Sequence, residues 1–147
     1  MIALYEKTAR QLNKLQDLPL LFFRLILAYG FYNPAMKKWS DIGAITQWFD
    51  SMGLPLPGLN AYLAASAEAL GVVLLTLGLG TRIISIPLMV TMLVAIFTVH
   101  IGNGFSAGNN GFEIPLYYLI MLVALLLYGS GKISIDYLIS KNRNSSQ

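Results

Sequence analysis

Four long runs of apolar residues dominate the chain, and each approaches the length of a membrane-spanning helix. They lie at about residues 19–36, 60–79, 83–101 and 114–128. A span needs about 20 mainly apolar residues, so four spans need roughly 80, and 56% of the 147 residues are hydrophobic. The pattern predicts an all-α, polytopic membrane protein, with a four-transmembrane-helix bundle in a single domain over residues 1–147.

Two shorter segments place apolar residues on one helical face only. Residues 1–17 combine leucines at helical spacing with charged residues, and Ser40-Asp41 is a typical helix start. The apolar face of the second segment consists of Ile42, Ile45, Trp48, Phe49 and Met52. Both segments are too short and too polar to span, so we expect short amphipathic helices lying in the membrane interface.

The few charges predict the orientation of the spans. Only 12% of the residues are charged, with a net charge of +3, and because these charges flank apolar spans we exclude nucleic acid as a partner. With both termini cytoplasmic, the inner side holds Lys7, Arg10, Lys14, Arg82, Lys132, Lys141 and Arg143, against Lys37 and Lys38 outside. Positive residues favour the cytoplasmic side, so both termini are predicted to lie there.

The first apolar run comes late and lacks a small-residue cleavage site, so no secretory signal is predicted.

Two charged residues fall inside the predicted spans, where charge is costly and usually faces the bundle interior. Glu68 lies near the middle of the second span, and Arg24 lies about five residues into the first. We expect the two to pair. This pair would either fix the helix register or provide a carboxylate that accepts protons or binds a ligand. Lys38 and Trp39, typical of an interfacial anchor, complete the candidate ligand-binding set.

His100, the only histidine, lies near the outer end of the third span, and Glu113 opens the fourth at a similar depth. We expect the glycine- and asparagine-rich loop at 102–111 to fold back and join them. Such a pair could exchange protons, as Glu68 could, or provide a weak, partial metal site. The alternative is a histidine that is simply capped at the interface.

The composition also limits redox chemistry. With no cysteine and a single histidine, the chain alone cannot hold an iron–sulfur cluster or a bis-histidine haem, and it shows no dinucleotide-binding motif for a flavin fold. A redox role would need a lipid-soluble carrier such as quinone, or a partner subunit.

Motifs spread over about residues 24–136 resemble the DoxX family of small four-helix membrane proteins. They are Arg24-Leu25, Phe31, Lys38, Gly53-Leu54-Pro55, Glu68, Gly71, Leu77-Gly78-Leu79, Thr81-Arg82, His100, Glu113, Gly129, Gly131 and Asp136. The chain departs from the family pattern at Ala28 and Ala35, where glycine is common, and at Pro34. The resemblance implies a membrane protein linked to sulfur or oxidative-stress metabolism, and some relatives are membrane subunits of quinone-reducing oxidoreductases.

We therefore expect a multi-pass protein of the bacterial inner membrane that binds quinone between its helices. At most it would be one subunit of a quinone-linked oxidoreductase, with a protein partner and with self-association left open. Arg24 and Glu68 would line the pocket, while His100 and Glu113 would exchange protons at the outer face. The alternative is a non-enzymatic membrane scaffold or transport accessory for a soluble, peptide or metal-handling partner.

Overall fold

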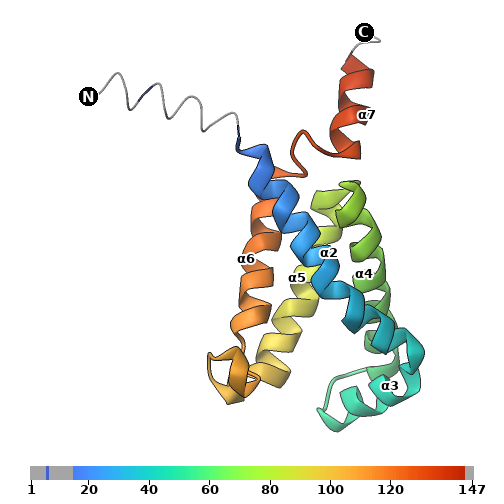
Figure 1. The fold of residues 1–147 in the computed structure, drawn as a ribbon. Coiled ribbons are helices and arrows are strands. Elements are labelled where there is room, and N and C mark those ends of the chain that lie inside the picture. Colours follow the sequence, from blue (N-terminus) through green and yellow to red (C-terminus); the bar gives the residue numbers. More distant parts are fainter. Residues whose placement is uncertain (1–5, 7–14, 145–147) are drawn as a thin grey trace.

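The computed structural model describes residue 6 and residues 15–144, and all the regular secondary structure in this part of the chain is helical. Four helices lie side by side in Figure 1 and form the bundle. They are α2 (Asp17–Ser40), α4 (Pro57–Leu77), α5 (Thr81–Ala95) and α6 (Glu113–Tyr128). The all-α fold is thus confirmed for these residues. The amphipathic helix predicted over residues 1–17 lies almost entirely outside them.

Shorter elements complete the fold. The predicted amphipathic helix after Asp41 is present as α3 (Ile42–Ser51), and the Asp41 carboxylate accepts a hydrogen bond from the Ala44 amide at 2.9 Å. A second short helix, α7 (Ile135–Asn144), was not predicted. Beyond α5 the helix widens into a π-helical turn, η1 (Ile96–His100), followed by 3₁₀ turns η2 (Ile101–Asn103) and η3 (Ala107–Asn109).

Small residues on α4 allow close packing inside the bundle. Ala61 and Ala65 are fully buried, as expected for a ridge of small residues four positions apart. The core of the bundle is apolar and draws on all four long helices. It includes Leu27, Phe31, Leu75, Leu88, Leu122 and Leu125.

The outer surface of the bundle is apolar as well, with exposed Leu, Ile, Val, Phe and Tyr side chains on all four long helices. Two stretches are long and apolar enough to cross a membrane, α4 and the continuous run Thr81–Asn103. The 16 residues of α6 reach only about 24 Å at 1.5 Å per residue, short of a ~30 Å hydrocarbon core. In α2, Arg24, Asn33 and Pro34 interrupt the apolar run. Four spans therefore stay a prediction.

At one end of the bundle, the chain between α6 and α7 closes over the α4–α5 turn. Gly78 and Gly80 make this turn with φ of 65° and 57°, a conformation that suits glycine. The Asp136 carboxylate accepts hydrogen bonds from the Gly80 amide at 2.8 Å and the Thr81 amide at 3.2 Å. Because these amides begin α5, the negative charge also interacts favourably with the helix dipole.

Candidate functional site

The centre of the candidate site is an ion pair between α2 and α4. The Lys38 Nζ donates to both carboxylate oxygens of Glu68, at 3.0 and 2.8 Å. Only 2% of the Glu68 side chain and 15% of the Lys38 side chain are exposed. A buried carboxylate needs such a partner, because an unpaired buried charge is strongly unfavourable.

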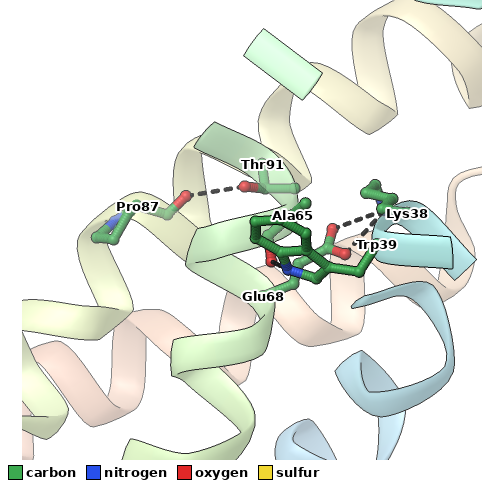
Figure 2. Close-up of polar contacts among 6 residues, drawn as sticks. All are labelled: Lys38, Trp39, Ala65, Glu68, Pro87 and Thr91. Carbon is green, nitrogen blue, oxygen red and sulfur yellow. Dashed lines mark hydrogen bonds and ion pairs between the residues drawn. The ribbon is translucent and has the colours of Figure 1, made fainter. Parts of the chain in front are cut away.

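Trp39 fixes the end of α2 against α4 beside this pair. Its indole N–H donates to the Ala65 carbonyl oxygen at 3.2 Å, and its ring meets Tyr62 edge to face at 6.1 Å. Figure 2 shows Trp39, Ala65 and the Lys38–Glu68 pair together. Trp39 therefore holds the backbone that presents Lys38. A cavity lies next to the ion pair, and Trp39 is not one of the residues that line it.

The predicted Arg24–Glu68 pair is wrong. Arg24 is buried at the opposite end of α2, where its guanidinium donates to the carbonyl oxygens of Leu75, at 3.4 Å, and Ile133. Leu75 is seven residues from Glu68 along α4, about 10 Å at 1.5 Å per residue. Arg24 thus links α2 to the chain around the α4–α5 turn. The partner of Glu68 is Lys38, in place of the Arg24 that was predicted.

The ion pair lines a cavity of about 940 Å³ between the helices of the bundle. Most of the lining is apolar and comes from α2, α4, α5 and α6, with α3 closing one side. Ligand pockets typically have about 300–1,000 Å³ and a few well-placed polar groups in an apolar wall. The cavity has the size and polarity of a site for an apolar small molecule with a polar headgroup.

His100 also lines this cavity, so three predicted site residues meet there, Lys38, Glu68 and His100. The His100 Nδ1 lies 2.8 Å from the Asn110 carbonyl oxygen. Since a carbonyl only accepts, Nδ1 carries the hydrogen and Nε2 of a neutral ring is left as an acceptor. The π-helical turn that presents His100 is a rare element, often found at functional sites.

The predicted pairing of His100 with Glu113 is also wrong for the conformation described. The Glu113 carboxylate instead accepts from the Ala107 amide at 2.9 Å and from the Tyr117 hydroxyl at 3.1 Å. The loop folds back as expected. Its backbone atoms, however, form hydrogen bonds with both side chains, the Asn110 carbonyl with His100 and the Ala107 amide with Glu113. Among the described residues no three His, Cys, Asp or Glu side chains gather in a metal-binding group, so a metal site at His100 and Glu113 gains no third ligand there.

Several polar residues of the cavity wall were not predicted, and Tyr118 and Thr91 are two of them. Tyr118 on α6 packs edge to face against Phe31, with ring centroids 5.5 Å apart, and its hydroxyl lies over Gly30. Thr91 on α5 donates to the Pro87 carbonyl oxygen at 3.1 Å (Figure 2). In the sequence, Tyr118 is one of two consecutive tyrosines, and only the helix phase decides which of them faces inward.

Comparison with known proteins assigns the chain to a family. The profile of the DoxX family matches residues 19–101, more than half of the chain. The chain belongs to the DoxX family. DoxX proteins are small membrane proteins, so the apolar outer surface of this bundle is explained by contact with lipid.

Two relatives match most of the chain. A protein from Haemophilus influenzae, described as uncharacterized, is 31% identical over 83% of both chains. A Bacillus subtilis protein named as the putative oxidoreductase CatD is 32% identical over 91% of this chain and 96% of its own. No solved structure matches the chain significantly.

Proposed function

We propose that this protein is a quinone-binding membrane subunit of an oxidoreductase system. The observation that carries the proposal is the Lys38–Glu68 ion pair, which lines an otherwise mostly apolar cavity of about 940 Å³. The name of the Bacillus subtilis relative, a putative oxidoreductase, supports the same class of function. Sulfur or oxidative-stress metabolism is the physiological setting that we propose.

In this proposal α2, α4, α5 and α6 cross the bacterial inner membrane, and α3 lies in its outer interface. The exposed apolar side chains around the bundle support this arrangement. The start of α5, where Arg82 lies, and the chain after α6, where Lys132 lies, are at the opposite end of the bundle from the end of α2, which carries Lys37 and Lys38. Both termini are then cytoplasmic, because positive residues favour that side.

The chemistry of the ion pair suits both redox forms of a quinone. The Lys38 ammonium donates hydrogen bonds and can bind a quinone carbonyl oxygen, while the Glu68 carboxylate accepts and can bind a quinol hydroxyl. Reduction of a quinone to a quinol takes up two electrons and two protons. Glu68 and His100 are the groups of the cavity wall that can pass those protons.

The electrons must come from elsewhere. The chain contains no cysteine and one histidine, and the described residues offer no metal-binding cluster. We therefore propose a redox protein partner that delivers electrons to the bound quinone, so that this chain supplies the quinone site and the proton path. Arg24 and Glu113 take no direct part, because neither lines the cavity.

Binding to the purified protein tests the proposal. Quinones should copurify and be found in organic extracts, and an added quinone should quench the fluorescence of Trp48, which lines the cavity. Glu68→Gln should keep affinity for the oxidised form but weaken binding of the quinol by roughly tenfold or more, the worth of a hydrogen bond to a charged group. Calorimetric titration without oxygen measures both affinities.

Asp50→Asn is the matched control, because Asp50 is an exposed carboxylate on α3 that does not line the cavity. It should change neither affinity. Absence of quinone from the extracts, together with no binding of added quinone, would contradict the proposal.

A non-enzymatic scaffold is the second candidate, favoured by the exposed apolar residues at the end of the bundle that carries α3. Figure 1 shows α3, the start of α4 and the loop before α6 at this end. The exposed apolar residues of these segments, Trp48, Leu56, Leu59 and Phe105, could dock a soluble, peptide or metal-handling partner. Under this alternative, Glu68→Gln would leave function intact, while substitutions at Trp48 or Phe105 would release the partner in copurification experiments.

A further inference from the structure

The cavity beside the Lys38–Glu68 pair opens sideways between α4 and α5. Four of its lining side chains are also exposed on the outer surface, Leu63 and Leu70 on α4 and Ile86 and Val90 on α5, each with more than half of its area exposed. Side chains that belong to both the cavity wall and the outer surface mark the mouth of the cavity. We name the gap bordered by these residues, together with Ala64 and Ala67, the α4–α5 portal.

Small side chains keep this portal open. Ala64, Ala67 and Gly71 follow one stripe of α4. At Gly71 the side chain of Leu88 on α5 fills the space beside this stripe, because a Cβ on Gly71 would lie 2.8 Å from Leu88 Cδ1. Towards the other end of α4, Ala64 and Ala67 line the cavity instead, opposite Thr91 and Ala95 on α5. The two helices are therefore in close contact near their shared turn and leave space further along.

The portal lies at the depth of the hydrocarbon core. Ala67 is the eleventh of the 21 residues of α4, so it lies near the middle of that proposed span. The other side of α4 is closed against α2, where Ala61 and Ala65 are fully buried and Trp39 meets Tyr62. The portal is therefore an opening of this cavity that faces acyl chains rather than headgroups.

The polarity along the cavity matches a molecule with a polar head and a long apolar tail. Lys38 and Glu68 provide charge at the closed side, while the portal residues are uncharged. We propose that the quinone enters and stays with its isoprenoid tail passing between α4 and α5 into the bilayer. This inference rests on the proposed quinone binding and adds the class of ligand, a long-tailed isoprenoid quinone rather than a water-soluble one.

Two probes that share one ring test it. One is a dimethoxy-methyl-benzoquinone without a tail, and the other carries two isoprene units. Affinities come from quenching of Trp39 and Trp48, the two tryptophans of the chain, in the full-length protein in detergent. Ala67→Phe and Val90→Phe should each weaken binding of the tailed probe roughly tenfold or more, because the added ring would occupy the space between α4 and α5 that the tail needs. Binding of the tail-less probe should stay within about twofold.

Val73→Phe is the matched control, since Val73 is an exposed residue of α4 that does not line the cavity. It should change neither affinity. Ala67 precedes Glu68 directly in the chain, whereas Val90 lies on α5 and is more than half exposed. The result for Val90→Phe therefore decides if Ala67→Phe disturbs the headgroup site itself. Equal effects of Val90→Phe on both probes, or none on the tailed one, would overturn the portal. If the unmodified protein bound neither probe, the proposed function would fail instead.

Discussion

At the scale of single residues, Glu68 is the residue on which we expect both the stability of the bundle and the proposed quinone binding to depend. Glu68→Ala would leave the Lys38 ammonium without its partner in a mostly buried position. Breaking a buried pair in this way costs about 3–5 kcal/mol, so we expect a loss of that order in the free energy of unfolding. Denaturant unfolding in detergent, followed by tryptophan fluorescence, measures it.

The double variant Lys38→Met with Glu68→Leu is the control for that loss. It removes both charges and keeps the volume, so most of the stability should return. A double variant that unfolds as readily as Glu68→Ala would show that the loss comes from packing and not from the stranded charge.

Asp136 is the second residue with a clear prediction. Its carboxylate accepts hydrogen bonds from the amides of Gly80 and Thr81 at the start of α5. Asp136→Ala should destabilise the protein by about 1–3 kcal/mol, the range for removing a charged hydrogen-bond partner. Thermal unfolding should show the loss, whereas Asp50→Ala on the exposed face of α3 should leave stability nearly unchanged. Equal stability of both variants would mean that the turn holds without the carboxylate.

At the scale of elements, the sequence predicted the existence of the long helices better than the contacts between them. Apolar runs located α2, α4, α5 and α6, and Asp41 correctly marked the start of α3. The partner of Glu68 could not be read in the same way. Depth in the membrane does not fix helix phase, and a lysine side chain is long enough to reach inwards from the last turn of α2.

Two elements were not predicted from the sequence. The π-helical turn at Ile96–His100 lies within a continuous apolar run, where an added residue changes the phase without changing the composition. The helix α7 is short and polar, and its position depends on contacts far along the chain, such as the hydrogen bond from the Asp136 amide to the Gly78 carbonyl oxygen.

The contact between α2 and α6 yields a prediction at this scale. A Cβ at Gly30 would overlap the hydroxyl and ring of Tyr118. Gly30→Ala should therefore displace Tyr118, destabilise the bundle by about 1–3 kcal/mol through overpacking and weaken quinone binding. Gly58→Ala, where the nearest atom is Thr46 Cγ2 at 3.8 Å, should be neutral or slightly stabilising because alanine favours helix. Thermal unfolding of both variants, with quinone titration, checks this; a Gly30→Ala protein as stable as Gly58→Ala would contradict the close approach.

At the scale of the whole molecule, the arrangement in the membrane follows from helix packing as well as from apolar length. Apolar length alone identifies α4 and Thr81–Asn103 as candidate spans, whereas α2 and α6 depend on packing against them. The contacts of α2 with α4, and of α6 with α5, place all four helices in one bundle. A shorter helix can be held in the membrane in this way, because the bilayer can thin around it at modest cost.

Four spans put both termini on one side and the 102–111 loop on the other. Positive residues predict that the termini are cytoplasmic, so a fluorescent protein fused at either end should fluoresce in the cytoplasm, and alkaline phosphatase fused after residue 106 should be active outside.

Single cysteines test the same topology without a fusion partner, because the sequence has no cysteine of its own. Ser106→Cys should react with a membrane-impermeant maleimide in intact cells, whereas Ser140→Cys on α7 should react only after the membrane is opened. Because α6 is the long helix between residue 106 and α7, labelling of both Ser106→Cys and Ser140→Cys in intact cells would mean that α6 does not cross the membrane, and the four-span bundle would have to be abandoned.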